Sequence, residues 1–136
     1  MLSRLLPAVT LCLFLAACSS TPSDQPEVAP VRGKVTKGGQ PVAGANVIFS
    51  PVGEGRSATA VTDAAGNYEL VYLRDIKGAR VGENEVRITT QQEPEIADDG
   101  TPIGGRKEEM PPNYLNGAEK RTVEAGKENV IDFAIP

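Results

Sequence analysis

From residue 31 onward, apolar and polar residues alternate with a period of two, and glycine and proline interrupt the alternation. The stretch VRGKVTK (31–37), for example, puts Val31 and Val35 on one face and basic side chains on the other. No part of the chain carries the i, i+3, i+4 apolar stripe of an amphipathic helix. The pattern therefore predicts short β-strands. We place them at 31–37, 45–51, 57–62, 67–72, 84–90, 120–124 and 130–135.

The same alternation predicts the core. The side chains expected to point inward are Val31, Val35, Ala45, Val47, Phe49, Tyr68, Leu70, Tyr72, Val86, Ile88, Ile131, Phe133 and Ile135. Between two strands, DAAG (63–66) predicts a hairpin turn in which Asp63 bonds the backbone two residues on and Gly66 takes a positive φ. Seven short strands separated by turns are typical of an all-β domain, so we expect a two-sheet β-sandwich over residues 31–136.

The first 17 residues have the pattern of a secretory signal peptide. Arg4 supplies a positive charge, and residues 5–17 are almost wholly apolar. These thirteen residues would rise roughly 20 Å as a helix, too little to cross a hydrocarbon core of about 30 Å. The sequence LAAC that follows resembles the bacterial lipobox, which implies cleavage between Ala17 and Cys18 and lipidation of the Cys18 thiol. The alternative is an ordinary cleaved signal peptide with an unmodified cysteine.

Acyl chains on Cys18 would anchor the protein, because each buried methylene contributes about 0.8 kcal/mol. Residues 18–30 are expected to form a flexible linker, since SSTPSDQPEVAP has three prolines and hardly an apolar side chain. Such a segment could hold the domain roughly 35 Å from the membrane. Ser19 stands where aspartate often signals inner-membrane retention in lipoproteins. We therefore expect a cell-envelope protein, anchored in the outer membrane rather than the inner one.

Composition argues against most enzyme chemistry. The chain has no histidine, the usual general base near neutral pH and the commonest metal ligand. Its formal net charge of −4 offers no basic footprint for nucleic acid. We expect no catalytic residue, no cofactor and no nucleic-acid partner.

Two acidic stretches invite comparison with calcium loops. Asp63 and Asn67 lie four residues apart, and Asp98 and Asp99 precede Gly100. Calcium takes six to eight oxygen ligands, which neither stretch supplies. Both are interpreted as turns, and no metal site is predicted.

The chain carries, in order, GKVTKGGQPVAGANVIFSP, TDAAGNYEL, KGARVGENEVRIT, MPPNYLN and VEAGKENVIDFAI. Together these segments resemble the carboxypeptidase regulatory-like, or prealbumin-like (transthyretin-like), domains of small bacterial lipoproteins. The resemblance covers residues 31–136 and implies a seven-stranded Greek-key β-sandwich without catalytic residues. One position departs from the family: an aromatic residue often stands two positions before the valine matched by Val86, and here that residue is Asn84.

Residues 91–118 are the longest stretch without alternation and hold four prolines and four glycines. Loops beyond about 12–15 residues in compact domains are usually functional or disordered. One interpretation is a loop that contacts an envelope protein partner. Its candidate contact residues are Ile103, Met110, Tyr114 and Leu115. The alternative is that MPPNYL (110–115) covers an open sheet edge while residues 93–106 are mobile.

The function that the sequence favours is a non-enzymatic, lipid-anchored envelope protein that acts as a structural or protein-interaction module. The alternative is a lipoprotein that binds a small ligand, such as a carbohydrate or another solute. Enzymes of the same broad fold, the transthyretin-like hydrolases of hydroxyisourate, use histidines and a characteristic C-terminal tetrapeptide. This chain lacks histidine and ends in FAIP.

Overall fold

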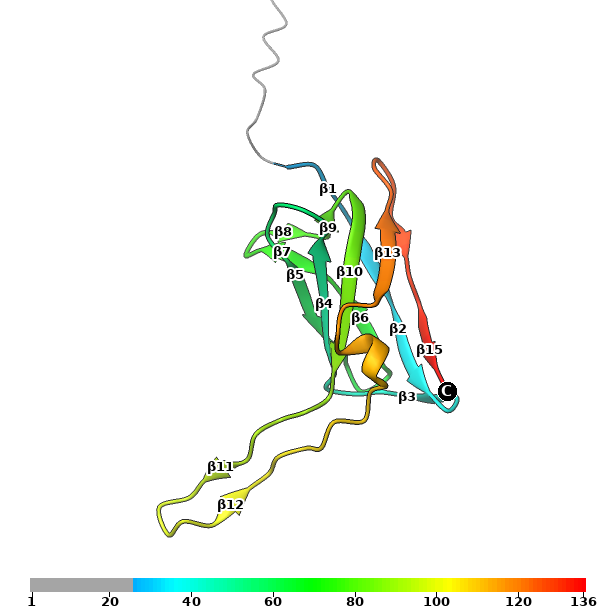
Figure 1. Ribbon diagram of the computed structural model, residues 1–136. Coiled ribbons are helices and arrows are strands. Elements are labelled where there is room, and N and C mark those ends of the chain that lie inside the picture. Colours follow the sequence, from blue (N-terminus) through cyan, green and yellow to red (C-terminus); the bar gives the residue numbers. More distant parts are fainter. Residues whose placement is uncertain (1–25) are drawn as a thin grey trace, which may run out of the picture.

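The computed structural model describes residues 26–136 (Figure 1). The expected signal peptide, the cleavage site at Ala17 and Cys18, and most of the linker lie outside the described residues. The strands are β1 (Val28–Ala29), β2 (Val31–Lys37), β3 (Gln40–Pro41), β4 (Asn46–Pro51), β5 (Ala58–Val61), β6 (Asn67–Glu69), β7 (Val71–Leu73), β8 (Ile76–Lys77), β9 (Ala79–Arg80), β10 (Gly82–Thr89), β11 (Glu95–Ile96), β12 (Pro102–Ile103), β13 (Glu119–Val123), β14 (Asn129–Val130) and β15 (Phe133–Ile135). Among the described residues, the 3₁₀ helix η1 (Pro112–Tyr114) is the one helical element.

The larger sheet is antiparallel and has the order β13-β10-β4-β5-β7-β8. Its central pair is β4 and β10, with Val86 opposite Phe49 and Ile88 opposite Val47. All four of these side chains are fully buried. Since residues that are directly opposite share a face, the alternation in both strands points to the same core.

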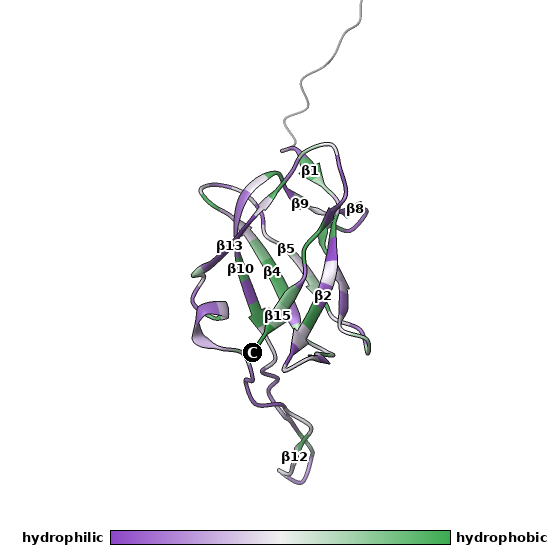
Figure 2. Cartoon of the chain, turned by 90° about the vertical axis from the view of Figure 1, so that its right-hand side faces the viewer, coloured by the Kyte–Doolittle hydropathy of each residue, from purple (hydrophilic) through white to green (hydrophobic). Residues whose placement is uncertain are grey.

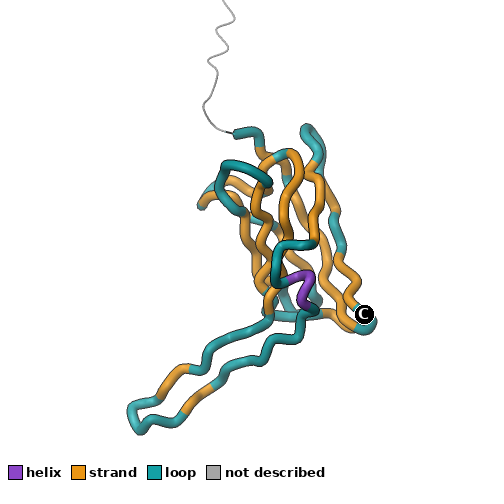
Figure 3. Tube along the Cα trace, in the orientation of Figure 1, coloured by secondary structure: helices purple, strands orange, loops and turns teal. Residues whose placement is uncertain are grey.

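The second sheet is built around β2. One edge of β2 pairs antiparallel with β6 and with β3, and the other edge pairs parallel with β14 and then β15. Arg32 illustrates the central position of β2, because it lies opposite Glu69 of β6 and also opposite Val130 of β14. The expected all-β fold and β-sandwich are therefore confirmed (Figure 3), while the Greek-key connectivity stays a prediction.

The two sheets enclose one core that centres on Phe133. Its ring lies 6.2 Å from the rings of Phe49 and Tyr68 and 6.0 Å from that of Tyr114, measured between centroids. The guanidinium of Arg121 covers the same ring at 4.9 Å. Figure 2 shows the hydrophobic residues gathered along strands such as β4 and β15. Most of the side chains expected to point inward are buried, but Tyr72 and Ile131 are only half-buried.

The expectation of one strand over 67–72 was wrong, because the chain changes sheets within it. β6 pairs with β2 in the second sheet, and β7 pairs with β5 in the larger sheet. Leu70, between them, is fully buried, and its backbone N–H donates to the Val31 carbonyl. A period of two persists through such a crossing, so the alternation could not reveal it.

The expected strand 130–135 is also divided, at Ile131 and Asp132. Side chains take over the missing ladder bonds at this break. The Tyr68 hydroxyl donates to the Ile131 carbonyl at 2.5 Å, and the Lys34 backbone N–H donates to Asp132 Oδ1 at 2.9 Å. The Tyr68 ring can reach across β2 because Gly33 has no side chain, and a Cβ there would overlap the Ile131 carbonyl. Burial of the Tyr68 hydroxyl, reinforced by nearby Asp132 and opposed by Arg121, raises its pKa well above the ordinary value.

Asn84, which departs from the aromatic residue of the resembling family, is fully buried in β10. Its side-chain amide donates to the carbonyls of Arg80 at 2.9 Å and Gly82 at 3.1 Å. These bonds hold the tight entry into β10, where Gly82 has a φ of 111°. The amide is therefore bonded through its N–H₂ group, while its Oδ1 has no hydrogen-bond partner among the described residues.

Candidate functional site: a projecting β-hairpin

Residues 91–109, here called the hairpin, leave the sandwich at the end opposite β1 (Figures 1 and 2). The short strands β11 and β12 pair with Glu95 opposite Ile103 and Ile96 opposite Pro102. Nearer the sandwich, the backbones of Gln92 and Arg106 exchange two hydrogen bonds of 3.0 and 2.9 Å. The sequence shows no strand pattern in this stretch, but in the structure it forms an extended, two-stranded projection.

The tip of the hairpin is a tight turn around Gly100, whose φ is 82°. The backbone N–H of Ala97 donates to the Thr101 carbonyl at 2.9 Å, and the N–H of Thr101 donates to Asp99 Oδ1 at 2.9 Å. This hydrogen bond from Thr101 holds the pKa of Asp99 below its ordinary value. Asp98 and Asp99 thus lie in a turn, as the sequence predicts for this stretch.

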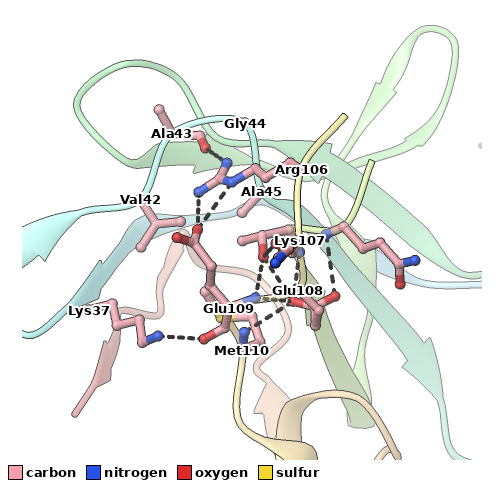
Figure 4. A network of polar contacts seen from close by, with 12 residues as sticks. Lys37, Val42, Ala43, Gly44, Ala45, Arg106, Lys107, Glu108, Glu109 and Met110 are labelled. Carbon is pink, nitrogen blue, oxygen red and sulfur yellow. Dashed lines mark hydrogen bonds and ion pairs between the residues drawn. The ribbon is translucent and has the colours of Figure 1, made fainter. Parts of the chain in front are cut away.

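One carboxylate, that of Glu108, holds the base of the hairpin to the end of β10 (Figure 4). Glu108 Oε1 accepts hydrogen bonds from the Thr90 backbone N–H at 3.0 Å, the Thr90 hydroxyl at 2.9 Å and the Met110 N–H at 3.0 Å. Its Oε2 accepts from the Gln91 N–H at 3.3 Å. Burial alone would raise the pKa of Glu108, but the hydrogen bonds from Thr90, Met110 and Gln91 outweigh it and lower that pKa. We call this arrangement the base clamp.

A second set of contacts joins the hairpin to the loop between β3 and β4. The Arg106 guanidinium donates to the Ala43 carbonyl at 2.5 Å and pairs with the Glu109 carboxylate at 2.6 Å. The Lys37 ammonium donates to the Glu109 carbonyl at 2.6 Å. The second strand of the hairpin is therefore tied to the sandwich at its base by contacts with Ala43 and Lys37.

The four candidate contact residues divide into two groups. Met110 and Tyr114 are buried at 6% and 8% exposure, and the Tyr114 ring meets Phe133 edge-on in the core. Leu115 and Ile103 are exposed at 36% and 59%. Met110 and Tyr114 thus pack into the core and offer little surface to a partner. That the segment 110–115 covers an open sheet edge stays a prediction.

The distal hairpin, residues 93–103, carries the other exposed apolar side chain. Ile96 is 66% exposed and, like Ile103, lies far along the projection. Ile96 was not singled out as a contact residue, although it is an isolated large apolar residue in a polar stretch. The sequence also did not predict that Glu108 accepts several hydrogen bonds at the base of the hairpin. In RKEE (106–109) two basic and two acidic residues balance in charge, so no single one of them stands out.

A separate open groove of about 570 Å³ lies on the outer face of the second sheet. Its lining is strongly charged and includes Arg32, Lys34, Glu69 and Asp132. Arg32 is paired with Glu128, and Glu69 is paired with the Lys77 ammonium at 3.0 Å. Much of the charge that lines the groove is therefore already paired within the protein, and few charged groups remain to bind a ligand.

The DAAG turn borders this groove. Asp63 Oδ1 accepts hydrogen bonds from the backbone N–H groups of Ala65 and Asn67, each at 2.9 Å, and Gly66 has a φ of 80°. This carboxylate oxygen is engaged by the turn itself. Within residues 26–136, no group of three or more acidic or cysteine side chains is placed to hold a metal ion. The same residues contain no helix long and apolar enough to cross a membrane.

No family model and no curated protein matches the chain. Among solved structures, the chain aligns with part of a 9R-lipoxygenase from Cyanothece PCC8801, with a TM-score of 0.41 and 15% sequence identity. The alignment covers 98% of this chain and 18% of the lipoxygenase chain. A similarity of this size carries no argument about activity. The resemblance to carboxypeptidase regulatory-like domains stays a prediction from the sequence.

Proposed function

We propose that the protein is a non-enzymatic, lipid-anchored module of the cell envelope that contacts another envelope protein through the hairpin. The anchor would be Cys18, in the outer membrane, and the linker would be the residues before β1. The last residues of the expected linker belong to the domain, because Val28–Ala29 pairs with β9 and Ala29 is buried. The observation that supports this proposal best is the base clamp together with the exposed Ile96 and Ile103. A two-stranded hairpin that buries few apolar side chains is only marginally stable by itself. Here buried and charge-assisted hydrogen bonds hold its base in place. We infer that the outer part of the hairpin has a function.

The placement of the hairpin supports the same proposal. The described chain begins near β1, and the hairpin leaves the sandwich from the opposite end. A tether at the β1 end would leave the hairpin free to reach away from the attachment point. Loops and projections on a rigid scaffold are where binding residues concentrate.

The test is a mild cross-linking capture from native membranes. It compares the full-length protein with a variant in which residues 93–109 are replaced by a short glycine-serine link. The expected result is that a specific envelope protein is captured by the native protein and lost with the variant. Equal capture of the same proteins by both forms would contradict the proposal.

The second candidate function is binding of a small polar ligand, and the groove beside Lys34 and Asp132 is the observation that favours it. A thermal-shift screen of sugars and charged solutes tests this candidate. Saturable stabilisation that disappears with Lys34→Ala would support it, and the absence of any saturable shift would leave the hairpin as the functional surface.

A further inference from the structure

We propose that the distal hairpin docks edge-on into a groove of a partner protein, and that each wall of this groove carries an apolar patch among lysine and arginine side chains. This inference rests on the proposed function and specifies the chemistry of the partner. It follows from the apolar residues of the hairpin, their placement, and the charge around them.

The apolar side chains point in two directions. Ile96 lies beside Pro102 on one face of the hairpin, and Ile103 lies beside Glu95 on the other, because consecutive residues of a strand alternate between faces. Both isoleucines remain more than half exposed. A flat partner surface could cover only one of them at a time. A groove that receives the hairpin edge-on could cover both.

The charge of the distal hairpin has one sign. Residues 93–103 contain Glu93, Glu95, Asp98 and Asp99 and no lysine or arginine, so their formal charge is 0 − 4 = −4. None of these carboxylates takes part in an ion pair among the described residues. By contrast, the base of the hairpin is balanced, because Arg106 and Lys107 are matched by Glu108 and Glu109.

The negative charge of the distal hairpin limits the kinds of surface to which it can bind. A second copy of the hairpin, an anionic phospholipid surface and a nucleic acid would each be repelled. Acidic side chains on an exposed strand pair also oppose edge-to-edge association with an identical hairpin. A protein groove with basic walls is attracted by the carboxylates, and an apolar patch on each wall would remove the isoleucine that faces it from water.

Fixation of the hairpin favours such docking. Because the base clamp and the Arg106 contacts already order the two strands, less conformational entropy is lost when a partner binds. The free edges of β11 and β12, which pair only with each other, remain available for backbone hydrogen bonds to the floor of the groove.

The test uses the full-length protein in native membranes, with capture followed by coupling with a water-soluble carbodiimide. This reagent joins a carboxylate to a primary amine only when the two are in contact. The charge variant is Glu93→Gln/Glu95→Gln/Asp98→Asn. It spares Asp99, whose carboxylate holds the turn through Thr101.

The matched control neutralises the same number of exposed acids near the β1 end, as Glu27→Gln/Glu54→Gln/Asp75→Asn. We expect amide cross-links between hairpin carboxylates and lysines of one protein. Capture of that protein should fall about tenfold with the charge variant, and by a similar factor when the salt is raised from about 0.05 to 0.5 M. The control should capture it at the native level.

Three results would overturn the inference, and they show whether the proposed function fails with it. Capture that needs residues 93–109 but is insensitive to salt and to the charge variant would keep the interaction function and exclude a basic groove. Cross-links to amines of lipid headgroups, without a protein adduct, would show a membrane contact instead. Capture that does not depend on residues 93–109 at all would refute both.

Discussion

Removing the Glu108 carboxylate should release the base of the hairpin without unfolding the sandwich. In Glu108→Ala, the backbone N–H groups of Thr90, Gln91 and Met110 lose their acceptor. Thr90 is fully buried, so its N–H cannot replace the lost hydrogen bond with one to water. A buried donor left unsatisfied costs about 1–3 kcal/mol, and hydrogen bonds to charged acceptors are worth about 1.5–3 kcal/mol each but are not additive here.

We therefore expect Glu108→Ala to lower the free energy of opening at the hairpin base by about 2–4 kcal/mol. Glu108→Gln keeps one oxygen acceptor but loses the charge and presents an amide N–H₂ group to a backbone donor. Since charge-assisted bonds are roughly twice as strong as neutral ones, we expect a loss of about 1–2 kcal/mol for this variant.

The assay is amide hydrogen exchange followed by NMR or mass spectrometry. Each 1.4 kcal/mol corresponds to a factor of ten, so exchange at Thr90 and Met110 should accelerate roughly 30- to 700-fold in Glu108→Ala and about tenfold in Glu108→Gln. The matched control is Glu93→Gln, an exposed carboxylate of the same hairpin with no ion pair among the described residues. Exchange at Val86, in the middle of β10, should stay unchanged in all three variants.

Exchange at the hairpin base within twofold of the native rate in Glu108→Ala would refute this reasoning. A uniform acceleration that includes Val86 would refute it too, because it would show that Glu108 stabilises the whole domain rather than the hairpin.

Three further predictions concern the base clamp and the packing of the sandwich. Because the pKa of Glu108 is lowered in the fold, the clamp contributes its full stability above the ordinary pKa of about 4.3 and loses it as the pH falls through the lowered value. Exchange at the base, corrected for intrinsic rates, should accelerate below about pH 4 in the native protein and lose this pH dependence in Glu108→Gln. Gly33→Ala should lower the free energy of unfolding in urea by about 2–4 kcal/mol, since the new Cβ overlaps the Ile131 carbonyl and displaces its hydrogen-bond donor. An equal or higher stability would contradict the described packing. In the same assay, Met110→Ala should lower the free energy of unfolding by about 2–3 kcal/mol, because Met110 is buried. Leu115 is more exposed, so Leu115→Ala should lower it by less than about 1 kcal/mol. A larger loss for Leu115→Ala than for Met110→Ala would show that Met110 does not cover the core.

The central strands could be predicted from the sequence because each has one buried and one exposed face. Val47, Phe49, Val86 and Ile88 follow a strict period of two, and all four are buried as expected. The very short strands, such as β1 and β9, were missed because two residues carry no period. The parallel pairing of β15 with β2 joins distant parts of the chain, and local alternation holds no information about partners.

The candidate site was harder to predict for a different reason. Both faces of β11 and β12 are exposed, so burial imposes no alternation there, and the stretch looks irregular. Met110 and Tyr114 were candidates both for contact with a partner and for cover of a sheet edge, and the structure places them in the core beside Phe133. The function of Glu108 depends on backbone donors from two segments, and only the folded chain brings these together.

The most direct test of the account places a photo-activatable cross-linker at Ile103 in the full-length protein within native membranes. The matched control carries it at Val52, an equally isolated exposed apolar residue that is 51% exposed and lies beyond the end of β4. A discrete protein adduct from position 103, and none from position 52, is the predicted result. An adduct from position 52 alone, or none from either position, would contradict the claim that the hairpin is the contact surface.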